Sequence, residues 1–129
     1  MAKVELDFQK CHGLIPAIAQ DYESGEVLML AYISPESWAE TLSSGYATYF
    51  SRSRNKLWKK GESSGHVQKI HSILVDCDLD TVVFKVEQLG SGACHTGHRS
   101  CFYREVDGET FRETEKPVFD ADKVYQVKK

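Results

Sequence analysis

Residues 75–81 read VDCDLDT, an acidic stretch that also contains one of the four cysteines. The segments on either side of it, residues 67–75 and 82–89, are rich in β-branched and aromatic side chains, which favour strands. We therefore predict that these two segments are antiparallel partners in a sheet. If the stretch between them is also extended, its alternate side chains point to the same face.

Three carboxylates lie at alternate positions of this stretch, with a cysteine between the first two. In an extended chain, Asp76, Asp78 and Asp80 would project from one face and Cys77 from the other. Carboxylates on one face repel each other strongly unless a cation lies among them, and oxygen ligands suit a hard ion such as Mg²⁺ or Ca²⁺. The stretch therefore predicts a hard-metal site, with a solvated acidic turn as the alternative.

A second informative stretch, residues 93–102, reads ACHTGHRSCF and carries two of the four cysteines. Together with Cys77, the thiols of Cys94 and Cys101 would suit a softer ion such as Zn²⁺. The gap between Cys94 and Cys101 is wider than the close pair of a zinc finger, so ordinary buried thiols are the alternative. The glycine-rich, histidine-bearing loop around two thiols favours zinc. We predict two different metal sites that share one strand.

Residues 51–66 read SRSRNKLWKKGESSGH and are predicted to form a basic loop that binds phosphate. Arginine and lysine supply charge-assisted donors, serines supply hydroxyls, and glycines let backbone amides turn toward an anion. A solvated basic loop is the alternative, and Trp58 would either stack on a purine or lie half in the core. The candidate substrate-binding residues are Arg52, Arg54, Trp58, Lys59, Ser63, Ser64 and Gly65.

The N-terminal half predicts a hairpin followed by a helix. Residues 14–20 and 27–32 are apolar runs on either side of a turn, and the second run is apolar on both faces, so it should lie centrally or at a subunit contact. A helix should then begin with Ser34 as its cap and Pro35 in its first turn, and it should end at Gly45. The side chains expected to face the core are Trp38, Thr41 and Leu42.

Further strands are predicted over residues 46–50, 101–106 and 109–112. The expected fold is a β-rich α+β domain with about six to eight strands in a mixed or antiparallel sheet and one clear helix near residues 35–44. A single domain spans residues 1–129, with its motifs between about residues 13 and 106 and a charged tail from about residue 114.

Composition narrows the class of protein. The chain has 129 residues, 41% of them hydrophobic and 27% charged, with a net charge of −3, so it has no general affinity for nucleic acid. No apolar run is long enough to span a membrane, and no signal peptide leads the chain, so we expect a cytoplasmic protein with reduced thiols. The basic loop and the acidic stretch suit a small substrate with anionic arms and a metal-bound centre.

Several of these stretches together resemble the phosphoribosyl-AMP cyclohydrolase family of histidine biosynthesis. The resemblance lies in residues 13–18, 27–32, 50–54, 57–65, 76–80 and 93–102, and the last two stretches, in this order, are the most specific. It implies a hydrolase that opens the adenine ring of N1-(5-phosphoribosyl)-AMP between N1 and C6, using zinc-activated water.

The resemblance also implies the cofactors and the assembly. One Zn²⁺ per subunit would be held by Cys77, Cys94 and Cys101, and one Mg²⁺ per subunit by Asp76, Asp78 and Asp80. Members of the family are intertwined homodimers in which both chains contribute zinc ligands. His95 lies inside the family motif, and we expect it to carry protons or to be a fourth ligand.

Two other classes of function are compatible with the same residues. A zinc-stapled structural module would have four protein ligands and no open coordination position. A nucleotide-binding regulator would bind a phosphorylated purine without converting it.

Overall fold

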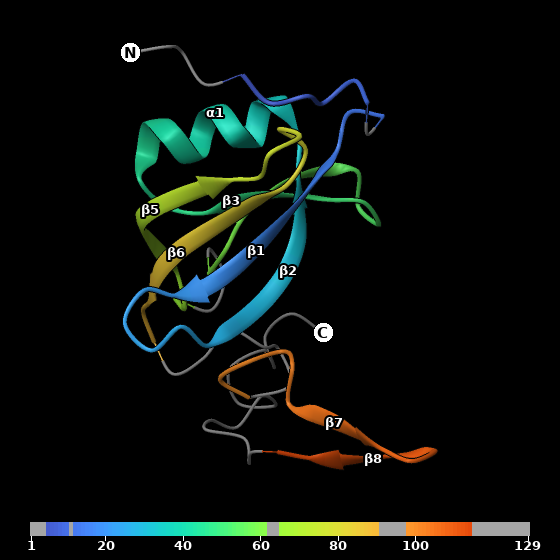
Figure 1. Ribbon diagram of the computed structural model, residues 1–129. Coiled ribbons are helices and arrows are strands. Elements are labelled where there is room, and N and C mark those ends of the chain that lie inside the picture. Colours follow the sequence, from blue (N-terminus) through green and yellow to red (C-terminus); the bar gives the residue numbers. More distant parts are fainter. Residues whose placement is uncertain (1–4, 11, 62–64, 91–97, 115–129) are drawn as a thin grey trace.

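The computed structural model describes residues 5–10, 12–61, 65–90 and 98–114. In this part of the chain a six-stranded sheet, one helix and a separate hairpin make up the α+β architecture that the sequence predicted (Figure 1). The sheet has the order β4-β3-β2-β1-β6-β5. Its strands are β1 (Ile15–Asp21), β2 (Val27–Ile33), β3 (Thr48–Ser51), β4 (Lys56–Lys59), β5 (Gln68–Val75) and β6 (Val82–Gln88). The hairpin consists of β7 (Arg104–Asp107) and β8 (Thr110–Glu113).

The β1–β2 hairpin occupies the centre of the sheet, as predicted. β1 pairs antiparallel with β2 and parallel with β6, so the sheet is mixed. Along β1, buried and half-buried residues alternate, which is the pattern of a strand with one face on the core. The core is formed by that face together with buried residues of β2, β3, β6 and the helix, of which Tyr49 and Phe84 are the largest with no exposed surface.

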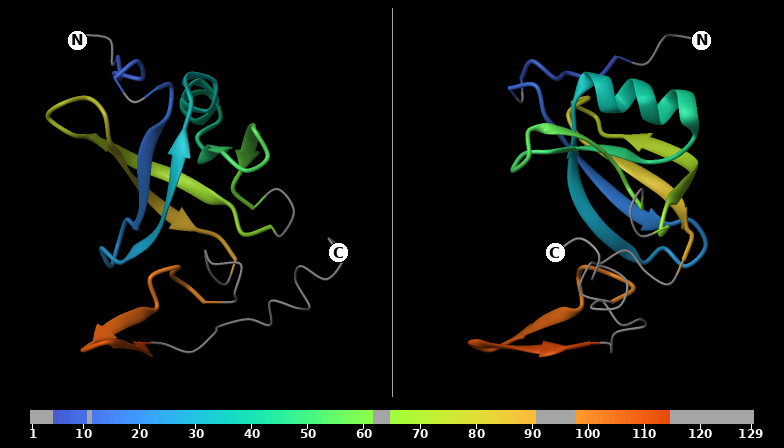
Figure 2. Two further views of the ribbon diagram at one scale, coloured as in Figure 1. Left: turned by 90° about the vertical axis from the view of Figure 1, so that its right-hand side faces the viewer. Right: turned by 180° about the vertical axis from the view of Figure 1, so that it is seen from behind.

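The helix α1 (Pro35–Ser44) begins and ends as its sequence predicts. The Ser34 hydroxyl accepts a hydrogen bond from the Ser37 amide at 3.2 Å, and Gly45 ends the helix in the left-handed conformation with φ of 80°. The helix lies on the same side of β1 and β2 as the β3–β4 hairpin (Figure 2).

The prediction that Leu42 faces the core was wrong. Leu42 is 55% exposed, whereas Ser37, Trp38 and Thr41 are buried. The hydroxyl of Thr41 donates to the Thr48 carbonyl at 3.1 Å and accepts from the Thr48 amide at 3.0 Å. This polar contact with β3 rotates the buried stripe away from the side that Leu42 occupies.

The prediction that the VDCDLDT stretch is extended was also wrong. Residues 76–81 form the turn between β5 and β6, and Leu79 adopts a positive φ of 64°. The cause is local, because the Asp76 carboxylate accepts hydrogen bonds from the amides of Asp78 at 3.0 Å and Asp80 at 3.2 Å. Such side-chain bonds to nearby amides compete with strand pairing and favour a turn. The side chains therefore do not alternate between two sheet faces.

The basic segment 51–66 is not entirely a loop. Within it, β4 pairs antiparallel with β3, from Thr48 opposite Lys59 to Ser51 opposite Lys56. A tight turn joins the two strands, and Asn55 takes a positive φ of 53° within it. The arginines of the segment therefore lie at a hairpin end instead of in an extended loop.

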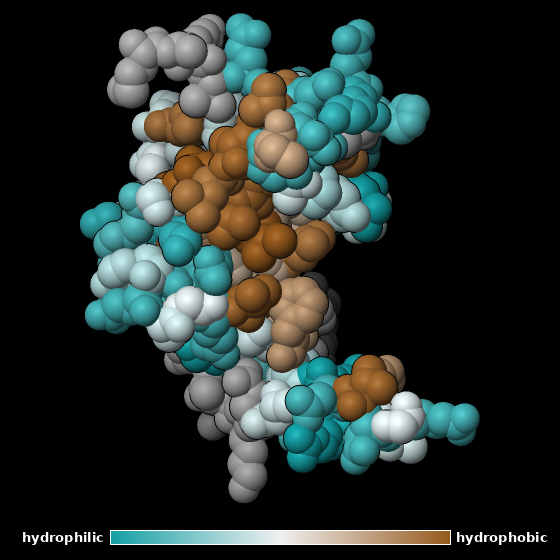
Figure 3. Space-filling model, viewed as in Figure 1, coloured by the Kyte–Doolittle hydropathy of each residue, from teal (hydrophilic) through white to brown (hydrophobic). Residues whose placement is uncertain are grey.

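The sheet face opposite the core carries a row of apolar side chains. Strand pairing aligns Leu74, Val83, Ile18 and Leu30 across β5, β6, β1 and β2. Leu74 is 52% exposed and Leu30 is 45% exposed, and Figure 3 shows an apolar patch over this face. Exposed apolar patches of this kind are typical of interaction surfaces. Within the described residues, no helix is long and apolar enough to cross a membrane.

Replacing Gly61 with alanine tests the close approach of two backbone segments. Gly61 has a φ of +85°, and an added Cβ would lie 2.4 Å from the backbone nitrogen of Val67. Backbone strain and overpacking should together lower the free energy of unfolding by about 2–4 kcal/mol, measured by urea denaturation. The control is Gly108→Ala, because Gly108 also has positive φ but no neighbouring atom within 4 Å of the added Cβ. Equal losses of free energy of unfolding in the two variants would show that the close approach of Val67 to Gly61 contributes nothing.

Candidate active site

The acidic turn between β5 and β6 brings oxygen and sulfur donors together. Ligand atoms of Asp76, Cys77 and Asp78 all lie within 4.8 Å of one another, and all three residues are exposed. Hydrogen bonds from the Asp80 and Asp78 amides lower the pKa of Asp76, although desolvation acts in the opposite direction. The turn therefore keeps a carboxylate ionised beside a thiol, and its amides fix the position of that carboxylate.

A cationic side chain already lies against this turn. The Lys10 ammonium is 3.4 Å from the Asp80 carboxylate and donates to the Asp78 carbonyl at 3.4 Å. Contact with the carboxylates raises the pKa of Lys10 even though desolvation acts in the opposite direction. The turn thus attracts positive charge. Its oxygen donors fit a hard ion such as Mg²⁺, and the Cys77 sulfur fits Zn²⁺ as one ligand of a larger set.

The second cysteine that the structure describes, Cys101, is hydrogen-bonded to β2. Its amide donates to the Leu28 carbonyl at 2.7 Å, and the hydroxyl of the preceding Ser100 donates to the Val27 carbonyl at 2.7 Å. Cys101 is exposed. Cys94 and His95, predicted as a zinc ligand and a proton carrier, lie outside the described residues.

Within one chain, the turn between β5 and β6 lies at the opposite end of the sheet from the segment that precedes β7 (Figure 1). The first carries Cys77 and the second carries Cys101. Cys77 precedes Val82, which is aligned through Ala17 with Ala31, whereas Cys101 is bonded to Leu28. Val82 and Leu28 are therefore separated by roughly 10 Å along the strand direction and by roughly 10 Å across the strands. Two thiolates of one zinc lie within about 4 Å of each other. These two thiols therefore cannot share a zinc ion within a single chain.

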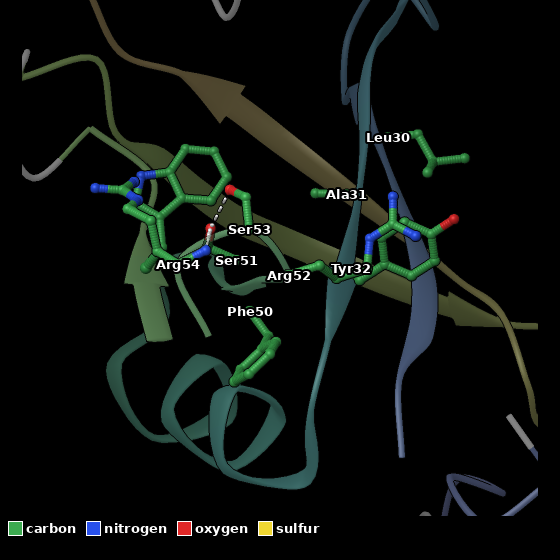
Figure 4. Close-up of a pocket in the computed structure, with 9 residues that line it drawn as sticks. Leu30, Ala31, Tyr32, Phe50, Ser51, Arg52, Ser53 and Arg54 are labelled. Atoms are coloured by element: carbon green, nitrogen blue, oxygen red, sulfur yellow. Dashed lines mark hydrogen bonds between the residues drawn. The ribbon is translucent and has the colours of Figure 1, made fainter. Parts of the chain in front are cut away.

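Two of the predicted phosphate-binding arginines line an open pocket of about 780 Å³ beside β2 (Figure 4). The Arg52 guanidinium lies 4.0 Å from the ring centroid of Tyr32, and Trp58 also lines the pocket. The pocket is lined by Leu30, Ala31, Tyr32, Phe50, Ser51, Arg52, Ser53, Arg54 and Trp58. Guanidinium and hydroxyl groups between aromatic walls are suited to a phosphorylated aromatic ligand.

The other predicted substrate-binding residues do not all join this pocket. Lys59 lies next to Trp58 on β4 but packs 5.0 Å from the ring centroid of Tyr46. The Gly65 amide donates to the Gly61 carbonyl at 2.7 Å, and Gly65 does not line the pocket. Ser63 and Ser64 lie outside the described residues.

The sequence did not reveal two features of the site. Tyr32 reaches the pocket because it is paired with Phe50, and this register is not visible in the sequence. Arg99 forms ion pairs with Asp21 and Glu26, which are more than seventy residues away in the chain. The only sequence signal for that contact was an arginine beside a predicted metal ligand.

Comparison with known proteins gives the family. The profile of the phosphoribosyl-AMP cyclohydrolase family matches residues 29–103. A phosphoribosyl-AMP cyclohydrolase from Desulfotalea psychrophila is 65% identical over 127 residues, covering 97% of this chain and 99% of the relative. This chain belongs to the phosphoribosyl-AMP cyclohydrolase family. The matched region runs from β2 to Tyr103 and includes the pocket, the acidic turn and Cys101.

Two further relatives agree. The phosphoribosyl-AMP cyclohydrolase of Desulfatibacillum aliphaticivorans is 58% identical, covering 95% of this chain and 98% of the relative. The histidine biosynthesis bifunctional protein HisIE of Thermoanaerobacter pseudethanolicus is 57% identical over 95% of this chain and 56% of the relative. Phosphoribosyl-AMP cyclohydrolases thus align with nearly the whole chain.

The Asp21 carboxylate should make the free energy of unfolding depend on pH. Burial would raise the pKa of Asp21, but hydrogen bonds from the Ser24 and Glu23 amides and the charge of Arg99 outweigh it and lower the pKa below its ordinary 3.8. The ionised carboxylate therefore stabilises the fold above about pH 4, and this contribution is lost as the pH falls through the lowered pKa.

Asp21→Asn should accordingly lower the free energy of unfolding at pH 7, and the deficit should shrink as the pH is lowered toward 3. Urea denaturation of the wild type and of Asp21→Asn between pH 7 and pH 3 measures this deficit. A deficit that stays constant with pH would contradict the assignment.

Proposed function

We propose that this protein hydrolyses the N1–C6 bond of the adenine ring in N1-(5-phosphoribosyl)-AMP, as a phosphoribosyl-AMP cyclohydrolase of histidine biosynthesis in the cytoplasm. The observation that carries the proposal is the 65% identity, over nearly the full length of both chains, to a protein of that name. The pocket with Arg52 and Arg54 supports it, because the substrate has two phosphate-bearing arms on one purine.

The reaction adds one water across one bond. The water oxygen bonds to C6 and the N1–C6 bond breaks. One proton of the water passes to N1 and the other to the exocyclic imino nitrogen on C6, so C6 becomes the carbon of a carboxamide. A zinc ion held by Cys77, Cys94 and Cys101 would supply the Lewis acidity that makes water nucleophilic near neutral pH. His95 is our candidate for taking a proton from the water and returning one to the leaving nitrogen.

The acidic turn would hold Mg²⁺ through Asp76, Asp78 and Asp80. The hydrogen bonds from the Asp78 and Asp80 amides support this role, because they fix the position of the Asp76 carboxylate. Lys10 would have to release the Asp80 carboxylate when a divalent ion binds. In this position the ion would anchor a phosphate or orient the purine.

The pocket beside β2 would bind one phosphate-bearing arm. Arg52 and Arg54 would contact the phosphate, and the ring of Trp58 would border the ribose or the purine. Lys59, Ser63, Ser64 and Gly65 would complete the phosphate contacts from the adjoining segment.

The zinc site would form between two copies of the chain. The separation of Cys77 from Cys101 supports this, since a second chain can bring its Cys101 to the first chain's Cys77. Two exposed apolar surfaces also support a homodimer. One is the sheet face with Leu74 and Leu30, and the other is the β7–β8 hairpin, where Val106 is 70% exposed and Phe111 is 69% exposed. Each dimer would hold two zinc and two magnesium ions.

Incubation with N1-(5-phosphoribosyl)-AMP tests the activity directly. The ultraviolet band of the adenine ring should disappear, and prior treatment with a zinc chelator should prevent this. Added zinc should restore turnover, and Asp78→Asn should raise the magnesium requirement while zinc content stays unchanged. An unchanged band at full zinc and magnesium occupancy would favour a structural or regulatory protein instead.

Mixing two inactive variants tests whether zinc ligands come from both chains. Cys77→Ser and Cys101→Ser should each abolish turnover and lower zinc content. A mixed dimer keeps one intact site, formed by Cys77 of one chain and Cys101 of the other. Random exchange of subunits in an equal mixture should therefore restore about a quarter of wild-type turnover.

The control for this experiment is a mixture of Cys77→Ser with Cys77→Ser,Cys101→Ser, which can form no intact site. Exchange is verified by mass spectrometry of differently tagged subunits. Mixed dimers without any recovered activity would refute ligation across the interface.

A further inference from the structure

An arginine beside Cys101 is held between two carboxylates of the β1–β2 turn. The Nη2 atom of Arg99 donates to Asp21 Oδ1 at 3.0 Å, and its Nε donates to Glu26 Oε1 at 2.8 Å. The Asp21 side chain is only 10% exposed, whereas those of Arg99 and Glu26 are about one-third exposed. Charge-assisted bonds of this kind are directional and stronger than neutral ones.

The Asp21 end of this cluster is rigid. Its other carboxylate oxygen accepts hydrogen bonds from the Ser24 amide at 2.7 Å and the Glu23 amide at 3.1 Å. The carboxylate is therefore fixed by the turn that follows β1. Because guanidinium is a planar fork, its bond to this fixed carboxylate together with its bond to Glu26 restricts where the Arg99 side chain, and hence its backbone, can lie.

The residues that follow Arg99 continue this attachment along β2. Ser100 donates its hydroxyl to the Val27 carbonyl and accepts from the Phe102 amide at 2.9 Å. Cys101 donates its amide to the Leu28 carbonyl at 2.7 Å. The position of the Cys101 backbone thus depends on a continuous set of contacts that begins at Arg99.

We propose that Arg99 is a positioning residue for the Cys101 thiol, acting through its ion pairs with Asp21 and Glu26. The inference rests on the proposed function, in which Cys101 is a zinc ligand. The Arg99 guanidinium already donates to two carboxylates. Its role is therefore to hold the segment with Ser100 and Cys101 against β2, and not to bind substrate phosphate. Outer contacts that orient a ligand commonly change metal affinity 10- to 100-fold when removed.

The test compares zinc affinity in Arg99→Met and in a matched control. Arg112→Met removes an arginine that also pairs with a glutamate, Glu105, but on the face of the β7–β8 hairpin opposite Val106 and Phe111. Competition with a chromophoric chelator should show zinc binding roughly tenfold weaker in Arg99→Met and unchanged in the control. Cobalt substituted for zinc should give a weaker thiolate-to-cobalt absorption band in Arg99→Met alone.

A conservative variant and a mild variant separate positioning from folding. Arg99→Lys keeps the charge but not the fork, so it should recover only part of the zinc affinity. Glu26→Gln removes one charge of the cluster and should weaken zinc binding at an unchanged melting temperature, even if Arg99→Met does not fold. With saturating zinc, turnover by the folded variants should return while KM stays that of the wild type.

The outcomes distinguish this inference from the proposed function. If Cys101→Ser lowers zinc affinity but Glu26→Gln and Arg99→Lys leave it unchanged, the positioning role is wrong and the zinc site stands. If Cys101→Ser itself leaves zinc affinity unchanged, the proposed zinc site is wrong. A raised KM for substrate in Arg99→Lys at full zinc occupancy would overturn positioning in favour of substrate binding.

Discussion

The parallel pairing of β1 with β6 is the constraint on which the rest of the site depends. It aligns the start of β6 with the start of β1, so the acidic turn before β6 lies at the end of the sheet where β1 begins. The antiparallel return of β2 carries the chain to the other end, where Cys101 is bonded to Leu28. No change of side-chain rotamer can bring these two thiols together, because the sheet hydrogen bonds fix both ends.

This separation connects features that otherwise look unrelated. The sheet has an apolar outer face, and the β7–β8 hairpin has exposed hydrophobic side chains. Both are surfaces of the kind that proteins use for interactions. Pairing with a second copy would cover both surfaces and would bring complementary halves of a metal site together. In this account the same contacts stabilise the assembly and complete the site, so catalytic competence and dimerisation cannot be separated.

Local sequence signals predicted the elements but not how they meet. Ser34, Pro35 and Gly45 gave the helix limits because capping depends on adjacent residues, and the apolar runs gave the central hairpin. The alternating aspartates predict an extended stretch, but the tendency of an aspartate carboxylate to accept from nearby amides makes it a turn. The pairing of Tyr32 with Phe50 and the contact of Arg99 with Asp21 depend on register and on distant contacts, which a single sequence does not encode locally.

The most direct test of the central claim is anomalous diffraction at the zinc absorption edge from crystals of the zinc-loaded protein. The account predicts one zinc per subunit at the interface, bonded to the sulfur of Cys77 from one chain and of Cys101 from its partner at about 2.3 Å. Zinc bound only by thiols of a single chain, or zinc remote from Cys77, would contradict it.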